Sequence, residues 1–157
     1  MKKNDFRIFL AAAIVCVFAL GVLTIIRFAQ RNIGESILVL QQETVIINNS
    51  KLALEIAATP EEQVRGLGGR DSLLPDSGMI FPFVHPGKPG FWMKDMRFAL
   101  DFIYVRGNKI VELKEAVKPA LVPTLFFPAE DVDAVIEVNA GWVAAHGIRV
   151  GDIFHTD

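Results

Sequence analysis

Residues 98–113 read FALDFIYVRGNKIVEL, and this stretch decides the fold that we expect for the rest of the chain. Two runs rich in β-branched and aromatic residues flank Gly107 and Asn108. Both residues tolerate the positive φ angles of a two-residue turn, which joins antiparallel strands. The stretch therefore predicts a β-hairpin with one strand on each side of Gly107-Asn108.

Similar short strands, separated by turn residues, are predicted on both sides of this hairpin. Residues 38–47 and 51–57 flank Asn48-Asn49-Ser50 and predict a second hairpin, and further strands are expected at 79–84, 91–96, 134–138 and 148–155. Residues 85–90 and 118–133 contain Pro or Gly repeatedly, so we expect an exposed turn and an irregular segment there. This pattern is typical of a compact antiparallel barrel or sandwich.

One or two short helices complete this mainly β fold. Thr59 can cap a helix, Pro60 fits its first position, and Glu62 follows the cap by three residues, as in a capping box. Gly66 is expected to end this helix. Residues 140–146 are expected to form one or two further helical turns.

The N-terminal segment has a different composition from the rest of the chain. Between Arg7 and Arg27, the residues from Ile8 to Ile26 are all apolar except Thr24. A helix of this length spans about 28 Å, close to the hydrocarbon thickness of a bilayer. We predict a single transmembrane helix within an anchor of residues 8–28. The alternative is a signal peptide whose cleavage would release a secreted domain, although no Ala-x-Ala site follows the apolar run.

The charges that flank this segment predict its orientation. Lys2, Lys3 and Arg7 precede it, and positive residues favour the cytoplasmic side. Residues 1–7 are therefore expected to form a cytoplasmic tail, residues 29–37 a linker, and residues 38–157 a β-rich domain outside the cytoplasm.

Composition excludes several classes of function for this domain. Residues 28–157 contain 12 Lys and Arg against 17 Asp and Glu, a formal charge of −5, with no basic run for nucleic-acid binding. The single cysteine, Cys16, lies in the predicted span, so the domain has no disulfide and no thiol nucleophile. His85, His146 and His155 are far apart in sequence, and no phosphate-binding loop is present. We therefore expect neither a metal nor a cofactor.

Two carboxylates interrupt the apolar strands and are candidate functional residues. Asp101 and Glu137 lie among the apolar residues of predicted strands, so both carboxylates are expected to be buried. Burying a carboxylate is costly unless it is paired or hydrogen-bonded. One interpretation is structural: an ion pair, or a carboxylate that accepts backbone N–H groups. The other is that both carboxylates line a ligand cleft, where they could act as acid and base. The candidate cationic partners are Arg65, Arg70, Lys94 and Arg97.

A second candidate group lies in the predicted strand 91–96. Alternation places Trp92, Lys94 and Met96 on one face of that strand. Trp92 could stack on a sugar ring while Lys94 binds its hydroxyls, or the two side chains could pack in the core.

Taken in order, several of these segments resemble the DUF192 family, small and often exported prokaryotic domains of unknown function. The resemblance is carried by residues 58–67 with Arg70, 79–83, 91–96, 100–104, 135–141, 147–148 and 151–152. It implies a compact β-dominated fold and an envelope location. Recurrent polar positions of the family would fall on Arg70, Lys94, Asp101 and Glu137.

The chain also departs from this family at two places. Gly68 and Gly69 stand where the family usually has Met and an aromatic residue, and Asp95-Met96 stands where Asn-Thr is typical. If those positions contact a ligand, this protein binds it differently or not at all.

Two functions follow as hypotheses. The first is a non-catalytic binding or accessory domain at the membrane surface, whose partner is a glycan, a small polar ligand or an envelope protein. The second is an envelope hydrolase that acts on cell-wall or saccharide material through Asp101 and Glu137, which would require both carboxylates at one open cleft.

Overall fold

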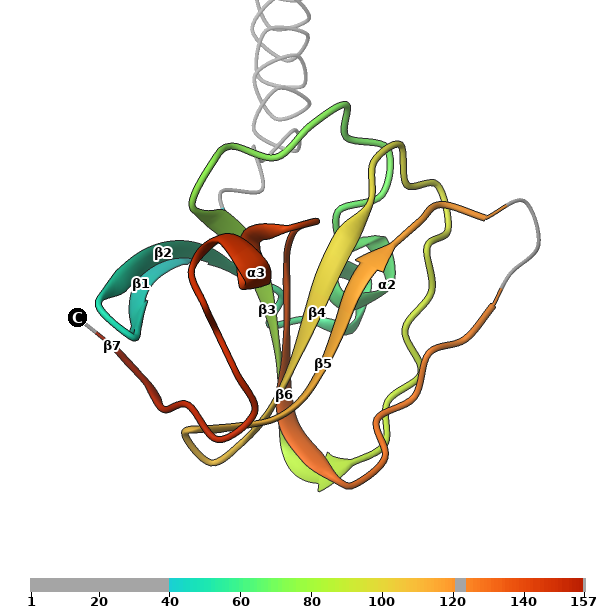
Figure 1. Cartoon of the computed structure of the whole chain (residues 1–157). Coiled ribbons are helices and arrows are strands. Elements are labelled where there is room, and N and C mark those ends of the chain that lie inside the picture. The colour runs from blue at the N-terminus through green and yellow to red at the C-terminus, as the bar shows by residue number, and fades with distance from the viewer. Residues whose placement is uncertain (1–39, 121–123, 157) are drawn as a thin grey trace, which may run out of the picture. The chain divides into compact units, whose positions relative to one another are not determined.

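Seven strands form one curled sheet in the residues that the computed structural model describes, 40–120 and 124–156 (Figure 1). The strands are β1 (Gln42–Ile47), β2 (Ser50–Ile56), β3 (Ser77–Gly87), β4 (Leu100–Arg106), β5 (Lys109–Val117), β6 (Val132–Asn139) and β7 (Phe154–Thr156). Their order across the sheet is β5-β4-β6-β3-β2-β1-β7. The predicted mainly β fold is confirmed, and its form is a half-barrel.

The sheet curls far enough for its two edges to exchange hydrogen bonds. Ile110 of β5 donates its N–H to the Asp152 carbonyl at 2.9 Å and accepts the Gly151 N–H at 2.8 Å. Phe154 of β7 donates to the Asn108 carbonyl at 2.9 Å. The segment before β7 therefore links the last strand to the first strand in the sheet order.

Both predicted hairpins are confirmed. β4 and β5 pair up to Arg106 and Lys109, with Gly107 at φ 60°. β1 and β2 meet at a turn in which Asn48 and Asn49 have φ angles of 48° and 68°. Positive φ at both central residues matches the right-handed twist of the strands that such a turn connects.

One strand pair departs from the antiparallel prediction. β2 and β3 run parallel, with Ala53 beside Ser77 and Ile56 beside Ile80. A parallel pair needs a crossover connection, and the residues between these strands include the helix α2 (Pro60–Arg65). Alternation of apolar residues is the same in both arrangements, so the sequence pattern did not distinguish them.

The helix α2 has the predicted capping box. Glu62 donates its N–H to the Thr59 hydroxyl at 3.2 Å, and the Thr59 N–H donates to the Glu62 carboxylate at 2.9 Å. Pro60 occupies the start of the helix, and Gly66 follows its last residue with φ 49°. The second helix, α3 (Trp142–Ala145), lies within the predicted segment 140–146.

Three predicted boundaries are wrong. Residues 91–96 form no strand, because only Phe91 pairs, in a single bridge with Phe126. β3 continues through the predicted turn at 85–87, since Gly87 pairs with Val132 after an irregularity. The predicted strand 148–155 is reduced to β7 and an isolated bridge at Ile153.

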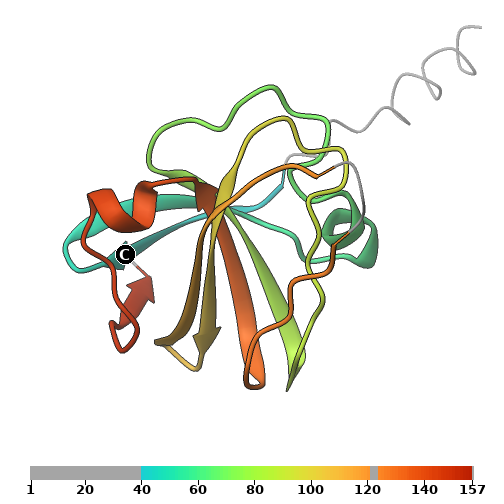
Figure 2. The same ribbon diagram turned by 45° about the vertical axis from the view of Figure 1, so that its right-hand side comes forward.

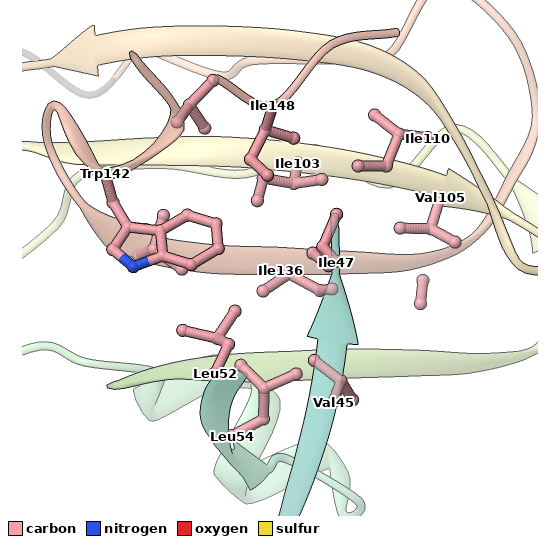
Figure 3. Packing of buried hydrophobic residues seen from close by; sticks show 13 residues of the cluster. Val45, Ile47, Leu52, Leu54, Ile103, Val105, Ile110, Ile136, Trp142 and Ile148 are labelled. Atoms are coloured by element: carbon pink, nitrogen blue, oxygen red, sulfur yellow. The ribbon is translucent and has the colours of Figure 1, made fainter. Parts of the chain in front are cut away.

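Each face of the sheet carries its own hydrophobic core, and the two helices lie on opposite sides of the strands (Figure 2). Inside the curl, side chains of β1, β2, β4 and β6 converge with Trp142 of α3 (Figure 3). The other face packs Leu67, which follows α2, against β3 and β4 and against Met93.

The predicted tail, anchor and linker fall in residues 1–39, outside the part of the chain that the structure describes. Among residues 40–120 and 124–156, no helix is long and apolar enough to span a bilayer.

Candidate functional site

A cavity of about 310 Å³ lies on the face of the sheet that packs against Leu67. Its walls come from α2 and the turn after it, from β3, and from the loop that precedes β4. Four aromatic residues contribute to the lining: Phe81, Phe83, Phe91 and Trp92. Phe81 and Phe91 pack edge to face with centroids 5.0 Å apart, and Phe83 and Phe91 with centroids 6.5 Å apart. The cavity therefore has a largely apolar, mutually packed wall.

The turn after α2 and the loop before β4 approach closely at Gly68. A Cβ atom there would lie 3.0 Å from the Arg65 carbonyl oxygen and 3.3 Å from that of Lys94. Gly69 adds a hydrogen bond from its N–H to the Asp95 carbonyl at 2.8 Å. The absence of a side chain at residue 68 thus brings Arg65 and Lys94 to the same edge of the cavity.

Glu137 of β6 belongs to the lining of this cavity. Its neighbours across the sheet are Met79 and Phe102, and the residue is only 5 % exposed. Within the described part of the chain, its carboxyl group has no hydrogen bond or ion pair. Burial raises the pKa of Glu137 to about 8, which favours the neutral, protonated form of the group at pH 7. It can both donate and accept a hydrogen bond.

Two cationic side chains stand where the cavity joins a wider groove of about 720 Å³. Arg65 and Lys94 line both spaces, and the Lys94 ammonium lies 5.4 Å from the centroid of the Trp92 ring. Neither forms a salt bridge with any residue in 40–120 or 124–156, whereas Arg97 of the groove pairs with Asp71. The junction therefore carries two positive charges without ion-pair partners among those residues.

Asp101 lies on the opposite face of the sheet and is fully buried. Its carboxylate accepts the N–H groups of Ala116 at 2.8 Å, Gly141 at 2.9 Å and Val143 at 3.1 Å. Two of these donors stand at the start of α3, so Asp101 of β4 caps that helix across the fold. This geometry agrees with the interpretation of a carboxylate that satisfies backbone amides.

Arg70 is also separate from the cavity lining. It forms a two-pronged ion pair with Glu55 of β2, with N–O distances of 2.6 and 2.7 Å. Of the five residues proposed from sequence, Trp92, Lys94 and Glu137 therefore line one cavity, whereas Arg70 and Asp101 have partners elsewhere.

Sequence reasoning missed most of the cavity wall. Phe81 and Phe83 belong to an apolar run that gave no reason to expect a cavity, and Arg65 was considered only as an ion-pair partner. Trp92, Lys94 and Met96 all line the cavity, but strand alternation is not the reason, because their segment is a loop and Phe91, expected on the other face, lines the cavity as well. Among the described residues, no cluster of three His, Cys, Asp or Glu side chains could hold a metal ion.

The fold defines a class of small β half-barrel domain. Its features are the curled sheet, the parallel crossover and the cavity on the face opposite Trp142. The chain belongs to the DUF192 family, described as an uncharacterized ACR, whose model matches residues 43–155. No curated protein matches the sequence.

Two crystal structures resemble this one. A proposed transcription regulator from Sinorhizobium meliloti 1021 is 28% identical with a TM-score of 0.69, over 74% of this chain and 95% of that protein. A protein of unknown function from Novosphingobium aromaticivorans DSM 12444 is 29% identical with a TM-score of 0.69, over 77% and 89% of the two chains.

Proposed function

We propose that this protein is a non-catalytic binding domain that holds a small organic ligand in the cavity lined by Glu137. The observation that carries the proposal is the buried carboxyl group of Glu137, which lines the cavity and has no partner among the described residues. Burying such a group without a hydrogen bond is costly, and buried polar groups are normally satisfied. A ligand in the cavity would supply the missing partner.

The dimensions of the site favour a small ligand over a protein partner. A cavity of about 310 Å³ is at the lower end of the range for small-molecule sites, which runs from about 300 to 1,000 Å³. Trp92 is 40% exposed at this site and can stack on a flat or ring-shaped ligand, including a sugar ring.

The geometry gives no support to the alternative hydrolase. Asp101 and Glu137 lie on opposite faces of the sheet, and Asp101 uses its oxygens on backbone N–H groups. Glu137 is the one acidic residue that lines the cavity within residues 40–120 and 124–156. The acidic character of residues 28–157, with a formal charge of −5, does not favour a role in transcription such as the one named for the Sinorhizobium protein.

We also propose that residues 8–26 anchor the protein in the membrane, with the domain outside the cytoplasm. The apolar run and the preceding Lys2, Lys3 and Arg7 support this orientation. Protease added to intact spheroplasts should remove a C-terminal tag. Protection of the tag would contradict the orientation, and release of a shortened chain into the medium would indicate signal cleavage instead.

Ligand binding can be tested on the full chain in phosphatidylcholine nanodiscs with a fragment library and ligand-observed NMR. Val64, which is 70% exposed, lines the cavity, whereas Val150, which is 59% exposed, does not. We expect fragments whose binding is lost in V64W and retained in V150W. If no fragment distinguishes these two variants, the proposed function is wrong.

A further inference from the structure

The cavity and the groove beside it have a consistent electrostatic pattern. At their junction, Arg65 and Lys94 present two positive charges, and no salt bridge to a described residue neutralises them. Glu62 lies near Arg65 but already accepts the N–H groups of Ala58 and Thr59 at 2.9 Å each. The groove adds Asp95, which does not line the cavity itself. An anionic group is therefore favoured at this junction.

The inner part of the cavity has a different character. Glu137 sits among apolar side chains such as Phe81 and Phe91 and offers an uncharged hydrogen-bonding group. An ammonium ligand could pair with an ionised Glu137, but it would share the site with the charges of Arg65 and Lys94. The inner part therefore suits an apolar body, and a hydrogen-bonding atom on that body would pair with Glu137.

The size of the cavity limits that body. A volume of about 310 Å³ is at the lower end of the range for small-molecule sites, so the cavity suits a small organic group. A phenyl ring with a short side chain is such a group, and so is a medium-length acyl chain.

We infer, on the basis of the proposed binding function, that the ligand is an amphipathic anion. Its apolar body lies along the aromatic wall toward Glu137, and its acidic group is bound between Arg65 and Lys94. The acid can belong to a free carboxylic acid or to the head group of an acidic lipid, because both sources present the same chemistry to the two cations.

Three probes with one carbon skeleton test this assignment: 3-phenylpropionate, 3-phenylpropanamide and 3-phenylpropylamine. Binding is measured at pH 7 by calorimetry and ligand-observed NMR on the full chain in phosphatidylcholine nanodiscs, with empty nanodiscs as the blank. We expect the acid to bind at least tenfold more tightly than the amide, and the amine to bind most weakly. Binding of the acid should be lost in V64W.

Charge-removing variants provide the matched comparison. R65Q and K94Q should each weaken binding of the acid several-fold while leaving the amide unchanged. R149Q, which changes a residue that lines neither the cavity nor the groove, should change neither. Nanodiscs that contain phosphatidylglycerol should compete with the acid if a lipid supplies the anion, and should have no effect if the ligand is a free acid.

The outcomes separate this inference from the proposed function. If V64W-sensitive fragments exist but the amide or the amine binds as tightly as the acid, the ligand class is wrong and the binding function stands. If R65Q and K94Q leave binding of the acid unchanged, the inference is also wrong. If no V64W-sensitive fragment exists, both proposals fail.

Discussion

Asp101 and Glu137 are both buried acids in central strands, yet their surroundings differ in one respect. Asp101 accepts hydrogen bonds from three backbone N–H groups, so its buried oxygens are satisfied. Glu137 receives no hydrogen bond from the described residues, and burial raises its pKa to about 8. Substituting the two by their amides should therefore have opposite effects on stability.

The substitution D101N should lower the free energy of unfolding by about 2–4 kcal/mol. An amide has one oxygen and two N–H donors, so it leaves at least one of the donors Ala116, Gly141 and Val143 without an acceptor. Urea unfolding at pH 7 measures the loss. The exposed substitution D131N is the control and should stay within about 0.5 kcal/mol of the unsubstituted protein. Equal stability of D101N and D131N would show that Asp101 does not hold α3.

The substitution E137Q should become relatively more stabilising as pH rises. Between the ordinary pKa of 4.5 and the folded value of about 8, the native state keeps a proton that the unfolded state releases. The stability of the unsubstituted protein therefore falls across this window, by on the order of a few kcal/mol in total, and E137Q lacks that fall. Urea unfolding of both proteins at pH 5 and pH 8.5 tests the difference. Parallel pH profiles would contradict the buried, unpaired state of Glu137.

The sequence allowed both carboxylates to be predicted as buried, but not their different roles. Strand alternation shows that a polar residue points inward, and that prediction depends only on neighbours in the chain. The donors that satisfy Asp101 include Gly141 and Val143, about 40 residues away, and their approach depends on how β4 lies beside β6. A pattern among neighbouring residues in the sequence cannot predict such a contact.

At the scale of single elements, the sequence correctly predicted the features whose residues interact only with their neighbours in the chain. The capping box at Thr59 and the turns at Asn48 and Gly107 are complete within a few residues, so they were predicted correctly. The segment 91–96 has strand-like alternation but lacks a partner strand. Pro89 and Pro128 have no N–H, so the pairing around Phe91 and Phe126 cannot extend into a ladder at those positions.

The cap of α2 can be tested separately, because it shapes one wall of the cavity. T59A removes the hydroxyl that accepts the Glu62 N–H, and it should lower the free energy of unfolding by about 1 kcal/mol. S72A, an exposed hydroxyl outside any helix or strand, is the matched control and should change little. Chemical unfolding followed by circular dichroism compares the two variants, and equal stabilities would show that the capping box is not needed to hold α2.

At the scale of the whole molecule, strand order depends on contacts that local patterns do not encode. The parallel pairing of β2 with β3 and the insertion of β6 between β3 and β4 join segments far apart in sequence. The cavity arises from the same long-range arrangement, since it combines α2, β3, β6 and the loop before β4. Three of the five candidate residues from the sequence therefore line the cavity, but the cavity itself could not be predicted from the sequence.

Closure of the sheet depends on the short segment that joins its two edges. Gly151 donates to the Ile110 carbonyl and adopts φ 102°, a conformation that is strained for any residue with a Cβ atom. G151A should therefore lower the free energy of unfolding by about 1–2 kcal/mol. G87A is the matched control and should be nearly neutral, because Gly87 has no positive φ and a Cβ atom added there would meet no other atom within 4 Å.

Urea unfolding and amide hydrogen exchange together distinguish loss of closure from a general loss of stability. If Gly151 holds the edges together, G151A should speed exchange most at the Ile110 and Phe154 amides, which bond across the closure. Amides in the centre of β4 and β6 should change only in proportion to the global stability. Uniform acceleration across the sheet would mean that the two edges are not held independently by this segment, and that the half-barrel unfolds as one cooperative unit.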